Sequence, residues 1–194
     1  MDVRDLIVNL LKNGCVKAKR PELLLSEFIY TKGNEVCVDS KEDLALWAVI
    51  WGYLSEGEVA RYLSWRSFER YVMKIFSEAG FQTRHSVRFR TLERLMEFDV
   101  IAYDGRKVFV IECKAWNKGS IQAIKKVARE HRLKVIEASD YLRKYGKIGI
   151  PIVVTLKGRP LISDSIIVPI RYIRDFVQKM DEVIYDYDYV QLGH

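Results

Sequence analysis

The stretch FDVIAYDGRKVFVIECKAW, residues 98–116, consists of two apolar runs on either side of an Asp-Gly pair at 104–105. An Asp-Gly pair between apolar runs is a strong signal for a β-hairpin with a two-residue turn. The same runs contain Asp99, Glu112 and Lys114, although charged side chains are rarely buried without a partner. The stretch therefore predicts a hairpin with a core face and a charged face.

The predicted turn also determines which residues of the hairpin oppose each other. A two-residue loop at 104–105 would place Asp99 opposite Val110. It would also place Glu97 opposite Glu112, which is an unfavourable pair of like charges. Because side chains alternate along a strand, each face would carry one kind of residue. The charged face would be Glu97, Asp99, Glu112 and Lys114, and the apolar face Phe98, Val100, Phe109, Ile111 and Cys113.

The charged face suggests a site for a cation. In this register Asp99 and Glu112 are diagonal neighbours, with Cβ atoms about 7–8 Å apart. Two carboxylates at that separation can bind one divalent ion through oxygen atoms. The alternative is a solvent-exposed sheet face on which Lys114 alone balances the charge of Glu112. The residues by themselves leave both interpretations open.

The remaining patterns predict an α/β fold with a mixed central sheet flanked by helices. Residues 1–62 read as a small N-terminal α+β module of helix, two strands and helix, serving in recognition, as a lid or in dimerisation. From residue 63 to 194 the predicted element order is α-β-β-β-α-β-β-α. The long helix over about 120–145 has an apolar stripe that includes His131, which we expect to be a packed core histidine.

The hairpin pattern resembles a known family. The motif is Asp99, then Glu112-Cys113-Lys114 on the hairpin, with Ser67-Phe68-Glu69 on the preceding helix and a long helix after it. This arrangement resembles the PD-(D/E)XK nuclease superfamily, which has the restriction-endonuclease-like fold. It is most similar to the archaeal Holliday-junction-resolvase and Mrr-type branch. Phe98 stands where the family pattern has a proline, and residues 1–60 lie outside the resemblance.

The resemblance implies a role for each motif residue. Asp99 and Glu112 would hold Mg²⁺, for which Mn²⁺ would substitute, and the backbone carbonyl of Cys113 is a further candidate ligand. Lys114 would help to activate the attacking water and stabilise the charge on the phosphate. Glu69 would add an acidic catalytic residue, although an acid in the first turn of a helix is also favourable by itself. Glu97 is a candidate outer or occasional metal ligand.

The chain also has residues suited to binding nucleic acid. Its formal net charge is +6, which favours a polyanionic partner. The strand TRHSVRFR would present Arg84, Arg88 and Arg90 on one face, as a phosphate-binding ladder or as a solvated edge. The other candidate nucleic-acid-binding residues are Gln122, Lys118 and Lys125. We expect DNA to be held mainly through its phosphates, with a homodimer cleaving the two strands.

The sequence also predicts features of the environment and chemistry. The three widely spaced cysteines favour buried thiols over a disulfide scaffold or a zinc site. No apolar run is long enough for a membrane span, and we expect a cytoplasmic protein. The predicted function is an Mg²⁺-dependent endonuclease that hydrolyses phosphodiester bonds in DNA. The alternatives are a non-catalytic nucleic-acid-binding or protein-interaction module on the same fold, and an RNA-processing nuclease.

Overall fold

The computed structural model describes residues 2–17, 27–91, 94–114 and 120–193. The chain divides into two compact units, Met1–Tyr71 and Val72–His194. The boundary predicted at 62/63 precedes helix α4 (Trp65–Glu78), whereas the two units divide within this helix. Within the described ranges, no helix has the length and apolar character needed to cross a membrane.

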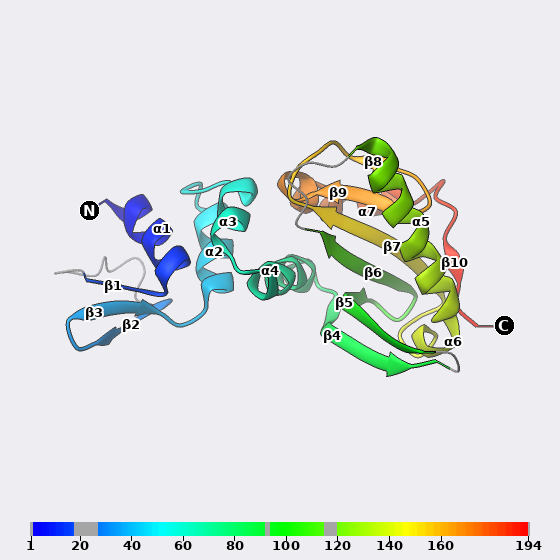
Figure 1. Cartoon of the computed structure of the whole chain (residues 1–194), viewed down its shortest axis with the longest axis horizontal. Coiled ribbons are helices and arrows are strands. Elements are labelled where there is room, and N and C mark those ends of the chain that lie inside the picture. The colour runs from blue at the N-terminus through cyan, green and yellow to red at the C-terminus, as the bar shows by residue number, and fades with distance from the viewer. Residues whose placement is uncertain (1, 18–26, 92–93, 115–119, 194) are drawn as a thin grey trace. The chain divides into compact units, whose positions relative to one another are not determined.

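The N-terminal unit combines helices with a small sheet (Figure 1). Its elements are α1 (Val3–Asn13), β1 (Cys15–Lys17), β2 (Ile29–Lys32), β3 (Glu35–Val38), α2 (Lys41–Ile50), α3 (Glu56–Tyr62) and the first part of α4. The antiparallel sheet has the order β1-β3-β2. Compared with the predicted helix, two strands and helix, the structure adds β1 and α3. Asp2 and Ser40 cap the helices α1 and α2 through their side chains.

The expectation of buried thiols is wrong for two of the cysteines. Strands β1 and β3 pair antiparallel, with Cys15 opposite Cys37, and these two residues form a disulfide. Their separation in the sequence concealed this pairing, because only the strand register makes them neighbours. Cys113 is a buried thiol outside the disulfide, as expected.

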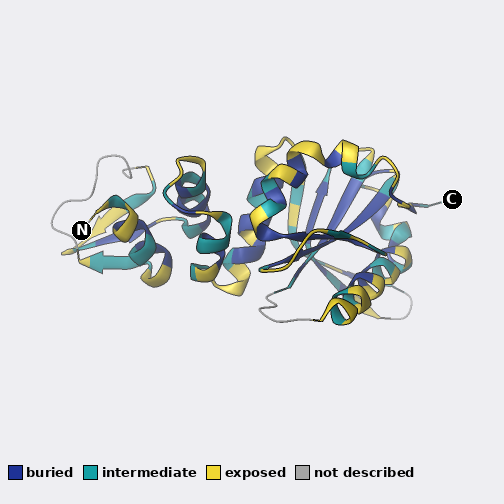
Figure 2. Ribbon diagram, turned by 90° about the horizontal axis from the view of Figure 1, so that it is seen from above, coloured by how far each residue is buried: buried dark blue, intermediate teal, exposed yellow. Residues whose placement is uncertain are grey.

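The C-terminal unit is a mixed sheet covered by helices on both faces, as the sequence predicts (Figures 1 and 2). Its elements after α4 are β4 (Gln82–Arg90), β5 (Leu95–Tyr103), β6 (Lys107–Lys114), α5 (Ile121–Glu137), α6 (Ser139–Leu142), β7 (Ile148–Thr155), β8 (Leu161–Ile162), β9 (Ile166–Pro169), η2 (Ile170–Tyr172), α7 (Ile173–Val183) and β10 (Val190–Gln191). The order of the seven-stranded sheet is β4-β5-β6-β7-β9-β8, and β10 pairs with the start of β7. Strands β4 to β6 are antiparallel, whereas β6, β7 and β9 are parallel.

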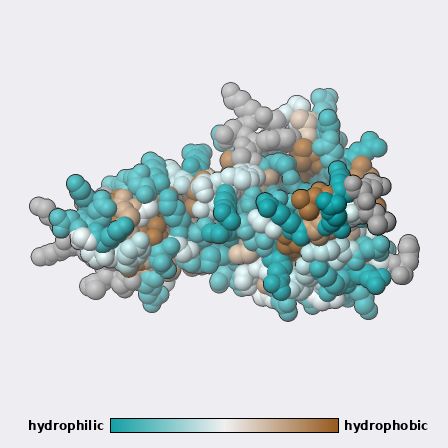
Figure 3. All heavy atoms as spheres, turned by 60° about the horizontal axis from the view of Figure 1, so that its bottom comes forward, coloured by the Kyte–Doolittle hydropathy of each residue, from teal (hydrophilic) through white to brown (hydrophobic). Residues whose placement is uncertain are grey.

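Each face of the sheet has its own apolar layer. Val108 and Val110 of β6 pack in one cluster with Val135 of α5. On the other face, Phe109 of β6 contacts Phe76 of α4, with ring centroids 5.9 Å apart. Even-numbered residues of β6 therefore face α5, and odd-numbered residues face α4. The face of the molecule drawn in Figure 3 is mostly hydrophilic, with smaller apolar patches.

The hairpin turn lies one residue later in the chain than predicted, with Asp104 opposite Lys107. The Asp104 side chain accepts hydrogen bonds from the backbone N–H groups of Arg106 and Lys107, at 2.9 and 2.7 Å. This turn moves the register by two positions, so that Tyr103 pairs with Val108 and Ile101 with Val110. The predicted pairing of Asp99 with Val110 is therefore wrong, because the Asp104 side chain and backbone close the turn on Lys107.

One glycine marks a close approach between the turn and β7. The carbonyl of Arg106 accepts hydrogen bonds from the backbone N–H groups of Lys147 and Ile148. A Cβ atom on the neighbouring Gly146 would lie 2.7 Å from this carbonyl oxygen and 2.8 Å from a methyl group of Val108. Both obstacles belong to the hairpin, and the carbonyl cannot rotate away as a side chain would.

We expect Gly146→Ala to lower the free energy of unfolding by about 1–3 kcal/mol, as overpacking does. The measurement is chemical unfolding, with hydrogen exchange of the β6 and β7 amides assigning the loss to the C-terminal unit. Gly57→Ala in α3 is the control, because nothing lies within 4 Å of its added Cβ atom. A Gly146→Ala variant as stable as the wild type would contradict the close approach.

Candidate active site

The site lies where strands β5 and β6 separate. The ladder between them ends at the pair Val100–Ile111, although β5 continues beside β4 and β6 beside β7. At the next position, Asp99 Oδ2 accepts a hydrogen bond of 2.7 Å from the backbone N–H of Cys113. Continuing the register by one residue places Asp99 opposite Glu112. The Asp99 carboxylate thus accepts a hydrogen bond from a backbone N–H of β6 at the point where the two strands diverge.

The alternation of side chains also breaks at Asp99. Phe98 and Ile101 belong to the same buried cluster under α5, although strict alternation would put them on opposite faces. On the neighbouring strand, Ser86 lies between the pairs His85–Val100 and Val87–Phe98 and has φ +48°. Positive φ is uncommon for serine and often occurs at functional sites. The alternation of side chains between the two faces of the sheet is therefore interrupted in both β4 and β5, at the level of Asp99.

This change of face corrects the predicted position of Glu97. Phe98 lies under α5, where its ring is 6.3 Å from that of His131, so Glu97 points to the other face. The Glu97 carboxylate instead receives hydrogen bonds from the guanidinium group of Arg88, at 2.9 and 3.4 Å. The like-charge pair of Glu97 and Glu112 that the sequence predicts does not form.

The same break divides the predicted arginine ladder. Arg84, Arg88 and Arg90 are all exposed on β4. The charge of Arg84 acts on Tyr141, which lies on the α5 side in a stack with Phe89. Arg88 neighbours Phe89 in sequence and faces away from α5 with Glu97. The prediction of one continuous row of arginines is therefore wrong, because the alternation of side chains along β4 is interrupted at Ser86.

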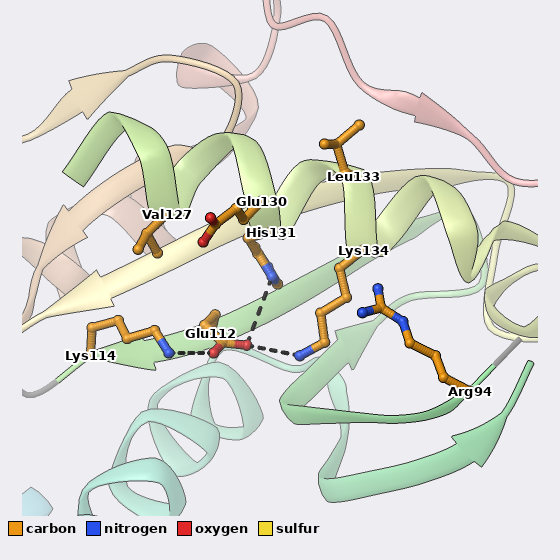
Figure 4. Close-up of a pocket in the computed structure, with 8 residues that line it drawn as sticks. All are labelled: Arg94, Glu112, Lys114, Val127, Glu130, His131, Leu133 and Lys134. Carbon is orange, nitrogen blue, oxygen red and sulfur yellow. Dashed lines mark hydrogen bonds and ion pairs between the residues drawn. The ribbon is translucent and has the colours of Figure 1, made fainter. Parts of the chain in front are cut away.

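Glu112 is the charge centre of the site, and its side chain is only 15% exposed (Figure 4). Its Oε1 atom is 2.6 Å from the ammonium group of Lys114, and its Oε2 atom is 3.2 Å from that of Lys134 on α5. Burial alone would raise the pKa of Glu112. The charge of Lys134 and the hydrogen bond from Lys114 outweigh burial, so this pKa is lowered and the carboxylate stays ionised.

Lys114 is held in its charged form by the same group of residues. Burial by itself would lower the pKa of Lys114, but the hydrogen bond and charge of Glu112 raise it. The charge of Asp99 acts in the same direction, which places this carboxylate within electrostatic reach of the ammonium group. Asp99, Glu112 and Lys114 therefore meet at one place, as the sequence predicts.

His131 is buried, as predicted, but it faces the charge centre. Its Nε2 atom lies 2.8 Å from the carbonyl oxygen of Val110, which can only accept, so Nε2 carries the proton. Burial lowers the pKa of His131 to about 4, and the ring is neutral near neutral pH. Its Nδ1 atom is 3.9 Å from Glu112 Oε2 and has no hydrogen-bond partner among the described residues.

A cavity of about 500 Å³ opens beside Glu112. The residues that line it are Arg94, Glu112, Lys114, Val127, Glu130, His131, Leu133 and Lys134 (Figure 4). Arg94 reaches the cavity from the connection between β4 and β5, and its guanidinium group pairs with Glu137 of α5 at 2.6 Å. The cavity is therefore bounded by β6, α5 and Arg94, and most of its charged groups are cations.

Lys134 and Arg94 were not predicted from the sequence. Lys134 follows His131 by three positions on the long helix, and residues at this spacing lie on one helical face. That spacing is the signal that could have identified Lys134. Arg94 carries no such signal, because its position depends on its ion pair with Glu137 of α5.

Of the predicted Asp99, Glu112 and Lys114, only Glu112 and Lys114 line the cavity, and the other predicted site residues also lie outside its lining. Gln122 and Lys125 are exposed in the first turns of α5. Glu69 is on α4 in the N-terminal unit and is 8% exposed. Lys118 falls outside the described residues.

The region around the site matches a known protein family. Residues 60–146 match the family model Mrr_cat, which is described as restriction endonuclease. This region is similar to restriction endonucleases. The match confirms the predicted resemblance to nucleases of the restriction-endonuclease-like type. Nucleases of this type generally use divalent metals.

Solved structures give weaker similarities. One is a protein of unknown function, AF1548, with 20% identity over 45% of this chain and 44% of that chain, at a TM-score of 0.36. Another is VC1899 from Vibrio cholerae, with 15% identity over 94% of this chain and 50% of that one, at a TM-score of 0.42. A third is Can2 from Sulfobacillus thermosulfidooxidans in complex with cyclic tetra-adenylate, with 14% identity over 92% and 50%, also at 0.42.

This chain thus spans at most half the length of the three solved structures. No curated protein matches the sequence.

The pKa of His131 predicts how stability depends on pH. The folded-state pKa is about 4 and the ordinary value is 6.5, so the unfolded chain takes up the proton first as the pH falls. Without bound metal, lowering the pH from 7 to 5 should cost the wild type about 2 kcal/mol more than His131→Gln, which has no proton to take up there. Urea unfolding in EDTA at each pH measures the difference. Parallel pH profiles would contradict a buried neutral imidazole.

Proposed function

We propose that this protein is a metal-dependent endonuclease that hydrolyses phosphodiester bonds in DNA. The proposal rests on the fork between β5 and β6, where Asp99, Glu112 and Lys114 meet beside a cavity rich in cations. The match of residues 60–146 to a restriction endonuclease family supports the same reaction class. Phosphodiester hydrolysis requires an activated water and compensation for the negative charge that develops on the phosphate.

The residues present fit a hard divalent cation. Asp99 and Glu112 offer carboxylate oxygens, and the carbonyl of Cys113 adds a third oxygen of the kind that Mg²⁺ binds. We propose Mg²⁺ as the cofactor, with Mn²⁺ as a substitute. Glu97 is the weaker candidate ligand, because Arg88 already holds its carboxylate. A bound divalent ion would lower the pKa of a water ligand and offset phosphate charge.

The electrostatics of Lys114 limit its role in the reaction. Its pKa is raised, so the ammonium group stays protonated near neutral pH and does not accept a proton from water. It can donate hydrogen bonds to the attacking water or to a phosphate oxygen. Lys134 has a similar relation to Glu112 from the other side, and Arg94 brings a third cation to the cavity. These three residues would hold the scissile phosphate against the carboxylates.

We also propose roles for residues other than Asp99, Glu112 and Lys114. Glu69 is proposed as an additional acidic residue, and the candidate DNA contacts are Gln122, Lys118, Lys125, Arg84, Arg88 and Arg90. A homodimer would supply one site to each strand of a duplex. Residues 1–62 would serve in recognition, as a lid or in dimerisation. A non-catalytic binding module is the second candidate, because each carboxylate of the site already has a partner.

We expect Asp99→Asn and Lys114→Ala each to slow DNA cleavage by at least about 100-fold, as loss of a charged catalytic group usually does. The assay uses supercoiled plasmid, a four-way junction, single-stranded DNA and RNA, each with Mg²⁺, Mn²⁺ or EDTA. Glu130→Gln is the matched control. This residue lines the same cavity, but its carboxylate pairs with Lys126 at 3.8 Å and contacts no member of the proposed centre.

Two outcomes would overturn the mechanism, namely cleavage in EDTA and cleavage that is undiminished in both variants. Preferential cleavage of RNA would favour an RNA-processing nuclease. Binding without cleavage of any substrate by the wild type would favour the non-catalytic module.

Phosphate contacts predict a steep dependence of binding on salt. The logarithm of the DNA-binding constant should fall linearly with the logarithm of salt concentration. Arg90→Gln and Lys125→Gln should each weaken binding for all sequences and reduce the slope by about 1. Fluorescence anisotropy with the Asp99→Asn protein as background measures binding without cleavage. Lys179→Gln on α7 is the control, and an equal change in slope for this variant would argue against a specific phosphate track.

A further inference from the structure

The neutral imidazole of His131 presents an unused lone pair to the charge centre. The neutral ring has one N–H proton, which Nε2 donates to the Val110 carbonyl. Nδ1 can therefore only accept a hydrogen bond. The atom that faces it is Glu112 Oε2, at 3.9 Å, which is also an acceptor (Figure 4). Two acceptors cannot form a hydrogen bond with each other. A buried acceptor without a partner is costly, and such a group needs a physical explanation.

Lys134 does not donate a hydrogen bond to Nδ1 of His131. Its ammonium group contacts Glu112 Oε2 at 3.2 Å and lies over the ring of Phe98, 5.0 Å from the centroid. It balances the charge of the carboxylate, but Nδ1 of His131 has no hydrogen-bond partner among the described residues. The site thus has a carboxylate oxygen and an imidazole nitrogen that lie close together and are both suited to the same cation.

The separation of the two atoms is close to that of two ligands of one metal ion. Ligand atoms about 2.1 Å from one ion lie about 3.0 Å apart at a right angle and about 3.4 Å apart at a tetrahedral angle. The observed 3.9 Å exceeds these separations by less than about 1 Å, so binding of the ion requires a small movement of the Glu112 carboxylate toward Nδ1. The hydrogen bond from Nε2 to a carbonyl is the usual partner of a metal-bound histidine, because it sets the tautomer and the ring orientation.

The helix that carries His131 holds the ring in place. Ser120 caps the start of α5, Ala128 and Val135 pack into the sheet, and Glu137 near its end pairs with Arg94. A ligand on a packed helix is better positioned than one on a loop.

We propose that His131 is a further ligand, through Nδ1, of the metal site built on Glu112, and that it shifts this site toward first-row transition metals. Imidazole nitrogen suits ions such as Co²⁺ and Ni²⁺, whereas Mg²⁺ takes mainly oxygen ligands. The inference rests on the proposed function, because it assigns a residue to the metal site of that reaction. It goes further by adding a nitrogen donor from α5 that is absent from the Asp-Glu-Lys motif.

The test compares two substitutions of His131 by calorimetric titration of the full chain with Co²⁺ and with Mg²⁺, without nucleic acid. His131→Gln keeps an N–H donor for Val110 and replaces the nitrogen ligand with an amide, whereas His131→Leu removes both functions. We expect Co²⁺ affinity to fall about 10- to 100-fold in both variants. Mg²⁺ affinity should change much less. Glu130→Gln is the charge control in the same cavity.

A spectroscopic measurement tests the same ligand directly. Pulsed electron paramagnetic resonance of Mn²⁺ bound to the wild type should show hyperfine coupling to a nitrogen nucleus, and both His131 variants should lack it. This comparison does not depend on nuclease activity. Circular dichroism and urea unfolding identify folded variants, and if His131→Leu fails to fold, His131→Gln and the wild-type spectrum decide.

The outcomes separate this inference from the proposed function. Asp99→Asn should weaken both Co²⁺ and Mg²⁺ binding, and if it weakens neither, the proposed metal site itself is wrong. If Asp99→Asn weakens both ions while the His131 variants bind Co²⁺ like the wild type, only the ligand role of His131 is overturned. Equal losses of Co²⁺ and Mg²⁺ in the His131 variants would also overturn it, because they would mean that His131 only positions Glu112.

Discussion

The hydrogen bond from the Cys113 backbone N–H to the Asp99 carboxylate is the interaction on which the site depends. It occupies the position where the β5–β6 ladder would otherwise continue. A hydrogen bond to a charged acceptor contributes about 1.5–3 kcal/mol, so the strands can separate here without leaving the N–H of Cys113 unpaired. The separation opens the sheet beside Glu112, and the reversal of β4 and β5 at the same level turns Glu97 away.

Residues of helix α5 help to keep the Glu112 carboxylate ionised. It supplies Lys134 on one side of the carboxylate and His131 on another, while Lys114 comes from the same strand. A buried carboxylate with fewer cations would have a raised pKa and become neutral. Here the cations outweigh burial, so the carboxylate remains an anion in a half-buried position. That balance keeps Glu112 ready for a cation from solution.

Much of the fold was predictable because it follows from local patterns. The periodicity of α5, the Asp-Gly turn and the apolar runs predicted the element order and the mixed sheet of the C-terminal unit. The convergence of Asp99, Glu112 and Lys114 was predicted despite an incorrect turn, because a shift of two positions keeps every residue of β6 on its face. The errors concern Glu97, the arginine row and the disulfide of Cys15 and Cys37, which depend on a strand reversal or on register.

By itself, the sequence determined the fold class and the three charged residues of the motif, because strand and helix periods are local properties of the chain. Only the tertiary structure decided what surrounds them. Lys134, His131 and Arg94 come from other elements and approach Glu112 only when α5 packs on the sheet. The ionisation of Glu112 and the buried, unpaired lone pair of His131 depend on distances between these elements. No periodicity encodes such distances, since they result from packing of the whole C-terminal unit.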